Sequence, residues 1–118
     1  MNKRRLGTEY ENMAGDYLTK QGYKILEKNY RNRFGEIDLI ASDTDGTIVY
    51  CEIKYRSNGD AGDPLEAVNT NKQRRISRTA LHHYAYNGYV KSKPCRFDVI
   101  GIYGDGTIRH IKNAFEYT

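Results

Sequence analysis

The sequence predicts an α/β fold with a mixed central sheet of about five strands flanked by helices, in the order α-β-β-β-α-β-β. Three observations lead to this prediction. Apolar residues repeat at helical spacing near the N-terminus, several short segments alternate between apolar and polar residues, and a second helical stretch separates the third strand from the fourth. The chain has 118 residues, which is the usual size of one domain. We therefore expect a single domain over residues 1–118.

The individual elements follow from local patterns. Gly22 is expected to end the first helix, and Asn87–Gly88 the second helical stretch. Asp63 followed by Pro64 is typical of the start of a helix. The predicted elements are a helix over residues 8–21, strands over 24–28, 35–41 and 47–55, one or two helices over about 64–86, and strands over 95–103 and 107–112. Residues 29–33 are expected to form a polar connection. The expected inner face of the second helical stretch consists of Ile76, Ala80, Leu81 and Tyr84.

The charge balance indicates a weak preference for anionic partners. Lys and Arg total 19 against 15 Asp and Glu, which gives a net charge of +4. No apolar run approaches the roughly 18–20 residues of a membrane span, and no apolar stretch follows the basic N-terminus. We therefore expect no membrane association and a cytoplasmic location. Cys51 and Cys95 lack C-x-x-C spacing and are expected to be small buried thiols.

The most informative pattern lies on the hairpin formed by the second and third strands. Alternate residues of a strand share a face, so the register of the hairpin decides whether its acidic residues meet. A two-residue turn would place Asp38 opposite Ile53, whereas a three-residue loop over residues 44–46 would place it opposite Glu52. The three-residue loop is a common hairpin type with glycine at its left-handed last position, which Gly46 fills. We predict this register.

In this register the Asp38 and Glu52 side chains lie about 4.5–5.5 Å apart at Cβ. Two carboxylates at this separation require a proton, a cation or full solvation, and hard oxygen ligands suit Mg²⁺ or Mn²⁺. Lys54 follows on the same face and is suited to polarising a water molecule or neutralising charge on a phosphate. The alternative is a solvated strand face on which Glu36 and Lys54 form a cross-strand ion pair.

The blocks that carry this pattern resemble a known family. They are Tyr23-Lys24-Ile25-Leu26-Glu27-Lys28-Asn29, Gly35-Glu36-Ile37-Asp38-Leu39-Ile40-Ala41, Glu52-Ile53-Lys54-Tyr55-Arg56, Pro64-Leu65-Glu66-Ala67-Val68 and Arg96-Phe97-Asp98-Val99. In this order they resemble the YraN-like family of small bacterial proteins. That family is similar to archaeal Holliday-junction resolvases and belongs to the PD-(D/E)xK nuclease superfamily. The resemblance covers nearly the whole chain and implies a restriction-endonuclease-like fold.

The resemblance also implies a set of site residues. Asp38 and Glu52 match the metal-binding acids, Lys54 matches the catalytic lysine, and Ile53 would supply a backbone carbonyl to Mg²⁺ or Mn²⁺. Glu11 matches an acidic residue on the first helix, where it would act as an auxiliary metal ligand. A structural alternative is equally open, because Thr8-x-x-Glu11 has the spacing of a capping box that would engage Glu11 locally.

Basic residues surround this acidic hairpin in the sequence. Lys72, Arg75 and Arg78 recur every three residues on the second helical stretch and form a row. Arg31, Arg33 and Arg56 flank the acidic segments. Both sets suit contacts with a phosphate backbone, without reading of the bases. The alternative is a solvated, charged helix face.

Together these features predict a metal-dependent endonuclease that acts on DNA, with branched or junction DNA as the implied substrate, by metal-assisted phosphodiester hydrolysis. The alternative is a catalytically idle nucleic-acid-binding module of the same fold that works through a protein partner. RNA is an open alternative as the nucleic acid, because backbone contacts alone do not separate it from DNA. Resolvases of similar fold act as dimers, which leaves a homodimer open.

The remaining polar and aromatic residues are expected to have packing roles. His82, His83 and His110 show no metal-ligand spacing, and packing or surface positions are expected for them. Asp98 is expected to be a solvent-facing or strand-pairing residue. The tyrosines of the 84–89 segment are expected to pack at the core and its rim, with stacking on bases as the alternative.

Overall fold

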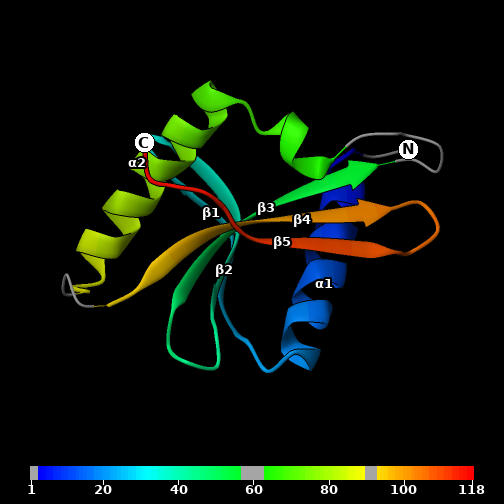
Figure 1. The fold of residues 1–118 in the computed structure, drawn as a ribbon, viewed down its shortest axis with the longest axis horizontal. Coiled ribbons are helices and arrows are strands. Elements are labelled where there is room, and N and C mark those ends of the chain that lie inside the picture. Colours follow the sequence, from blue (N-terminus) through cyan, green and yellow to red (C-terminus); the bar gives the residue numbers. More distant parts are fainter. Residues whose placement is uncertain (1–2, 57–62, 90–92) are drawn as a thin grey trace.

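The computed structural model describes residues 3–56, 63–89 and 93–118. Its elements are α1 (Lys3–Lys20), β1 (Lys24–Asn32), β2 (Gly35–Ser42), β3 (Ile48–Arg56), the short 3₁₀ helix η1 (Pro64–Ala67), α2 (Thr70–Tyr86), β4 (Cys95–Tyr103) and β5 (Ile108–Phe115). Figure 1 shows these elements around one strongly twisted sheet. The predicted order α-β-β-β-α-β-β is confirmed, and the stretch predicted to hold one or two helices before the fourth strand holds two, η1 and α2.

The sheet has the strand order β1-β2-β3-β4-β5. Strands β1, β2 and β3 form an antiparallel meander, and β4 and β5 form a second antiparallel pair. The crossover through α2 makes β3 and β4 parallel, with Tyr50 beside Phe97 and Lys54 beside Gly101. The predicted mixed sheet is therefore confirmed, because the hairpins require antiparallel pairing and the helical crossover permits parallel pairing.

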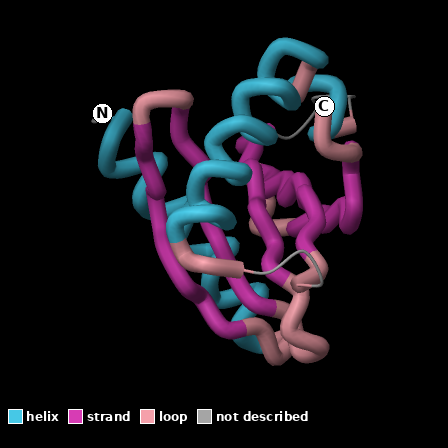
Figure 2. Tube along the Cα trace, turned by 90° about the vertical axis from the view of Figure 1, so that its left-hand side faces the viewer, coloured by secondary structure: helices cyan, strands magenta, loops and turns pink. Residues whose placement is uncertain are grey.

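The two long helices cover opposite faces of the sheet (Figures 1 and 2). On the α1 face, Ala14 and Leu18 of the helix pack in one buried cluster with residues of β2, β3 and β4. On the α2 face, Ile76 and Ala80 pack in a second buried cluster with residues of β2 and β3 such as Ile37, Ile40 and Tyr50. The sheet is thus apolar on both faces at its centre.

The predicted register of the β2–β3 hairpin is confirmed. Leu39 pairs with Cys51, and the pairing continues through Ile40 and Tyr50 toward the turn. The turn closes through a hydrogen bond from the Asp43 N–H to the Thr47 carbonyl, 2.9 Å long, which leaves three residues in the loop. Gly46 has a φ of 88°, the left-handed conformation that this loop type needs at its last position.

The structure corrects the predicted ends of two elements. Strand β1 continues to Asn32, so the expected polar connection over residues 29–33 is mostly strand. Its backbone pairs with β2, as between Arg31 and Glu36. Helix α1 begins at Lys3, which places Thr8 inside the helix. A residue inside a helix cannot serve as its N-cap, so the capping-box alternative for Glu11 is wrong.

Two burial predictions are also corrected. Ile76 and Ala80 of α2 are buried as expected, but Leu81 is 53% exposed and His83 is buried in its place. His83 faces the sheet, where its ring contacts the hydroxyl of Tyr50. Cys51 is buried in β3, whereas Cys95 is exposed because it stands at the first position of β4.

At its N-terminal end, η1 begins as predicted: the Asp63 carboxylate accepts a hydrogen bond from the Leu65 N–H, and Pro64 occupies the first helical position. Across the described ranges, no helix combines the length and apolar character needed to cross a membrane.

Candidate functional site

An acidic pair forms where β2 and β3 separate. Their backbone pairing ends at Leu39 and Cys51, and in a continued register the carbonyl of Ile37 would face the N–H of Ile53. Instead, the Asp38 carboxylate accepts a hydrogen bond from the Ile53 N–H, 2.8 Å long. The Asp38 carboxylate thereby takes the place of the Ile37 carbonyl as the acceptor. This holds it beside Glu52, the residue that precedes Ile53 on β3.

Glu52 and Lys54 form an ion pair that is largely removed from solvent. The Lys54 Nζ lies 3.4 Å from Glu52 Oε1, and the side chains of Lys54 and Glu52 are 18% and 16% exposed. Burial and the adjacent Asp38 carboxylate raise the pKa of Glu52 to about 8, although Lys54 acts in the opposite direction. Glu52 is therefore largely protonated at neutral pH unless a cation takes the place of its proton.

A second lysine joins this group from α2. The Asn69 side chain caps α2 by accepting a hydrogen bond from the Lys72 N–H, 3.0 Å long, so Lys72 lies in the first turn of the helix. Its side chain contacts Lys54, and this contact, with the charge of Lys54, lowers the pKa of Lys72. Two ammonium groups side by side favour an anion near both of them.

These residues line a hollow with a volume of about 670 Å³, which we call the basic hollow. Its lining consists of Arg31, Asn32, Arg33, Phe34, Gly35, Glu36, Glu52, Lys54, Lys72, Arg75 and Ile76. One wall comes from the β1–β2 turn, one from α2, and the floor from β3. Cationic side chains outnumber carboxylates in this lining, which makes the hollow suited to an anionic ligand.

A second hollow of about 660 Å³ lies next to the first, and we call it the acidic hollow. Its lining consists of Gly7, Thr8, Glu11, Asn29, Arg31, Glu36 and Asp38. Arg31 and Glu36 line both hollows and form an ion pair at 3.0 Å. The pairing of Glu36 with Arg31, and of Lys54 with Glu52, replaces the Glu36–Lys54 pair of the solvated-face alternative.

Glu11 reaches the acidic hollow from α1. Partial burial raises the pKa of its carboxyl group, and the charges of Asp38 and Glu36 act in the same direction. Glu11 is thus on the same side of the sheet edge as Asp38, on a helix that Leu18 anchors in the core. Three carboxyl groups from α1 and β2 therefore share one hollow.

The donor set suits a hard divalent cation that keeps most of its water. Among the described residues, no three His, Cys, Asp or Glu side chains are close enough to form a complete metal-binding group. Asp38 and Glu52 form an adjacent pair of oxygen donors, and Glu11 lies farther out in the acidic hollow. Mg²⁺ is commonly held by one or two carboxylates plus waters, so this pair fits such an ion.

The structure brings together five of the six cationic residues predicted to contact nucleic acid. Arg31, Arg33, Lys72 and Arg75 line the basic hollow. Arg78 lies in an adjoining hollow of about 450 Å³, which we call the arginine hollow and which is lined by Arg33, Phe34, Asn71, Arg74, Arg75 and Arg78. Arg56 lines neither, because it ends β3 beside the β4–β5 turn, where its carbonyl accepts a hydrogen bond from Gly104.

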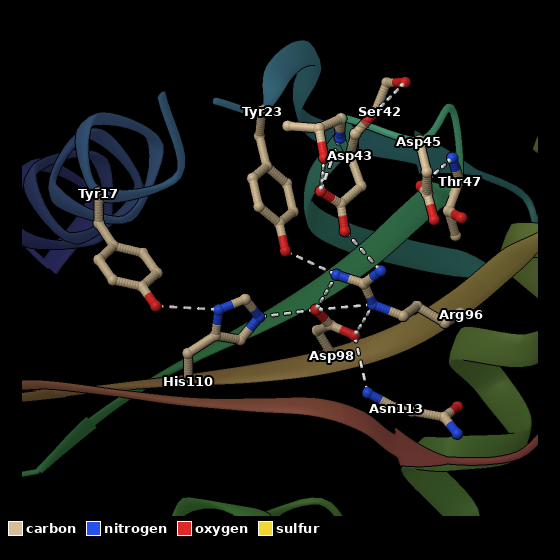
Figure 3. Close-up of polar contacts among 11 residues, drawn as sticks. Tyr17, Tyr23, Ser42, Asp43, Asp45, Thr47, Arg96, Asp98, His110 and Asn113 are labelled. Carbon is tan, nitrogen blue, oxygen red and sulfur yellow. Dashed lines mark hydrogen bonds and ion pairs between the residues drawn. The ribbon is translucent and has the colours of Figure 1, made fainter. Parts of the chain in front are cut away.

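Of the two roles expected for Asp98, strand pairing is confirmed by its pairing with Cys51 of β3, and the solvent-facing position is wrong. Asp98 is fully buried on the α1 face, and it accepts hydrogen bonds from Arg96 (3.0 Å), His110 (2.6 Å) and the Asn113 N–H (3.0 Å), as Figure 3 shows. Burial alone would raise the pKa of Asp98, but these hydrogen bonds outweigh it and hold the pKa below its ordinary value. Asp98 is therefore the centre of a buried polar network.

This network ties together four elements of the fold. Arg96 also donates to Asp43 in the β2–β3 loop and to the hydroxyl of Tyr23, and the His110 ring contacts the hydroxyl of Tyr17 on α1 (Figure 3). None of these side chains lines the basic or the acidic hollow. Within the described part of the chain, the network therefore stabilises the packing of α1 on the sheet and lies outside the candidate site.

Two solved structures are similar to this chain over part of their length. A crystal structure of a repair endonuclease from Pyrococcus abyssi is 16% identical with a TM-score of 0.49, covering 90% of this chain and 41% of that one. A structure of an EndoMS–dsDNA2 complex is 18% identical with a TM-score of 0.41, covering 79% of this chain and 34% of that one. This chain thus spans less than half the length of either.

Curated sequences give much closer relatives. A UPF0102 protein from Lachnoclostridium phytofermentans is 47% identical over 116 residues, which are 98% of this chain and 97% of the relative. Another from Thermodesulfovibrio yellowstonii is 47% identical over 115 residues, covering 98% and 99%. The profile of the family described as "Uncharacterised protein family UPF0102" matches residues 10–102. The chain therefore belongs to the UPF0102 (YraN-like) family.

Proposed function

We propose that this protein is a metal-dependent endonuclease that acts on DNA, with branched or junction DNA as its substrate. The observation that carries the proposal is the Asp38–Glu52 carboxyl pair, held next to Lys54 and Lys72 in a hollow with mainly cationic walls. The resemblance of the same residues to the PD-(D/E)xK motif supports it, and so does the exclusion of a capping role for Glu11.

The cation-binding residues are Asp38 and Glu52, with Glu11 as an auxiliary ligand and Ile53 supplying its carbonyl oxygen. A bound Mg²⁺ or Mn²⁺ would lower the pKa of a water molecule and polarise the phosphoryl oxygen. The protein's own contribution is to keep the two carboxyl groups together. The hydrogen bond from Ile53 fixes Asp38. Burial disfavours an uncompensated charge on Glu52, so a bound cation would stabilise its ionised form.

The lysines act on the phosphate. Lys54 is oriented by its ion pair with Glu52, so its ammonium lies at the boundary between the cation-binding carboxylates and the basic hollow. Lys72 adds a second ammonium next to it. A phosphate bound to both relieves their mutual repulsion and receives stabilisation for the charge that develops during hydrolysis. The arginines of the basic and arginine hollows hold the flanking phosphates.

The test is a cleavage assay on linear duplex, single-stranded, flap and four-way-junction DNA, with matched RNA, in Mg²⁺, in Mn²⁺ and in EDTA. We expect metal-dependent cleavage by the wild type, and a loss of about 100-fold or more in Asp38→Asn and Lys54→Met. Lys112→Met is the matched control, because Lys112 is exposed on β5 and lines neither hollow. Its activity should equal that of the wild type.

The alternative of an idle binding module makes a different prediction in the same assay. Salt-sensitive DNA binding without cleavage in either metal, unchanged by Lys54→Met, would overturn the nuclease proposal. That result would favour a protein partner that supplies the activity. Cleavage confined to RNA would replace DNA as the substrate class and leave the roles of Asp38 and Lys54 intact.

A further inference from the structure

We propose that a row of exposed rings, Phe34, His82 and Tyr86, binds unpaired bases of a single-stranded segment next to the basic hollow. We call these three residues the aromatic row. The inference rests on the proposed function, because it takes the ligand to be a nucleic acid, and it goes further by assigning a base-binding subsite. The substrate class that follows is a nucleic acid with an unpaired segment beside the phosphate at Lys54.

The aromatic row begins at the turn between β1 and β2, which is hydrogen-bonded to α2. The Asn32 side chain accepts a hydrogen bond from the Phe34 N–H, 2.9 Å long, and donates one to the carbonyl of Thr79, 3.2 Å long. Gly35 allows the close approach: an added Cβ there would lie 3.0 Å from Arg75 Cγ and 3.1 Å from Thr79 Oγ1, and its φ is 153°. The position of Phe34 is therefore fixed by α2.

Phe34 is an unusual residue for such a turn. Tight turns favour Gly, Asn, Asp, Ser or Pro, yet here a phenyl ring remains 37% exposed. The Arg33 guanidinium lies 4.9 Å from the ring centroid, and the His82 ring centroid lies 5.8 Å away. The Phe34 ring therefore has a cation over one face and a second ring close by. Single-strand-binding proteins combine cations and rings in this way to stack bases.

The row continues along α2. His82 and Tyr86 are one helical turn apart, with their ring planes within 15° of parallel and their centroids 6.4 Å apart. Tyr86 is 83% exposed, so packing does not account for it. This corrects the expectation that the tyrosines near the end of α2 pack at the core and its rim. Tyr84 and Tyr89 do pack against each other, whereas Tyr86 turns outward.

Charge and position connect the row to the candidate site. Phe34 lines both the basic hollow, with Lys54, and the arginine hollow, with Arg74 and Arg78. On α2, Arg78, His82 and Tyr86 follow one another at intervals of one turn. Along α2, a cationic side chain suited to a phosphate is therefore followed directly by rings suited to bases.

Bases in a duplex are paired and stacked on their neighbours, so their faces are not available to such a row. An unpaired strand offers both its phosphates and its ring faces, and a positively charged track interleaved with aromatic rings is the general solution for binding it. The geometry therefore favours single-stranded, flap or branched nucleic acid over continuous duplex.

Binding measurements without divalent metal separate this proposal from the proposed function. Fluorescence anisotropy would compare a single-stranded oligonucleotide with a continuous duplex for the wild type, Phe34→Leu, Tyr86→Leu and their double variant. A 2-aminopurine base in the single strand would report stacking through quenching. Tyr117→Leu is the matched control, because Tyr117 is an exposed ring that lines a different hollow.

We expect each ring substitution to weaken single-strand binding by about 5-fold to 150-fold, at roughly 1–3 kcal/mol per stacked base. Duplex binding should change less than about 2-fold, and 2-aminopurine quenching should decrease in parallel. Equal weakening for both ligands, or unchanged single-strand binding by the double variant, would overturn the subsite while leaving the nuclease proposal intact. Wild-type protein that binds neither ligand would overturn both proposals.

Discussion

Replacing Glu52 with glutamine tests whether the acidic pair is held under electrostatic strain. In the metal-free protein, burial and Asp38 raise the pKa of Glu52 to about 8, against an ordinary value of 4.5. The unfolded chain ionises this group at the lower pH and the folded protein only at the higher pH. Folding stability contributed by Glu52 is therefore complete below pH 4.5 and is lost as the pH rises toward 8.

The magnitude follows from the same two values. At 1.36 kcal/mol per pKa unit, the difference between 4.5 and about 8 corresponds to roughly 5 kcal/mol when fully developed. Between pH 5 and pH 8.5 the expected change is roughly 4 kcal/mol. Glu52→Gln removes the titrating group, so the variant should gain stability relative to the wild type across this interval.

The assay is urea denaturation at pH 5, 6, 7, 8 and 9 with EDTA, for the wild type, Glu52→Gln and the exposed control Glu116→Gln. The free energy of unfolding of Glu52→Gln minus that of the wild type should rise with pH by several kcal/mol. The same difference for Glu116→Gln should stay nearly constant. A difference for Glu52→Gln that stays within about 0.5 kcal/mol from pH 5 to pH 9 would refute the reasoning.

Three further predictions concern metal binding, the buried network and the turn. At pH 8, Mg²⁺ at about 100 times its Kd should raise the free energy of unfolding of the wild type by about 2.7 kcal/mol, measured by thermal denaturation. The same Mg²⁺ should stabilise Glu52→Gln little, and equal stabilisation of both would contradict the assignment of Glu52 as a ligand. Asp98→Asn should destabilise the fold by about 3–5 kcal/mol, because it leaves Arg96 buried without its full charge partner; a loss under about 1 kcal/mol by urea denaturation would be inconsistent with a central role. Gly35→Ala should lower the free energy of unfolding by about 1–3 kcal/mol, because its Cβ would crowd α2 at a positive φ, and an unchanged Tm would argue against the close packing of the turn.

Several features of this protein are determined locally and could be predicted from the sequence. Gly46 is suited to the left-handed position of a three-residue loop, and that loop sets the pairing of Leu39 with Cys51. Asp63 and Pro64 likewise begin a helix as their side chains dictate. These predictions succeeded because the energies that decide them act between residues a few positions apart.

Other features depend on how whole elements pack. The contact of Lys72 with Lys54 exists because α2 crosses the sheet next to the end of β3, and no spacing in the sequence encodes that approach. In the sequence, Asp98 is indistinguishable from an ordinary strand residue. Only the folded structure brings Arg96, His110 and the β2–β3 loop into one network with it. Whether a charged side chain is solvated or buried is decided by its neighbours in space, since burial penalises a charge and only nearby partners offset that cost. The sequence by itself therefore determined the strands, the hairpin register and the acidic motif, while the tertiary structure alone decided which cations stand beside that motif and which carboxylate lies at the centre of the buried network.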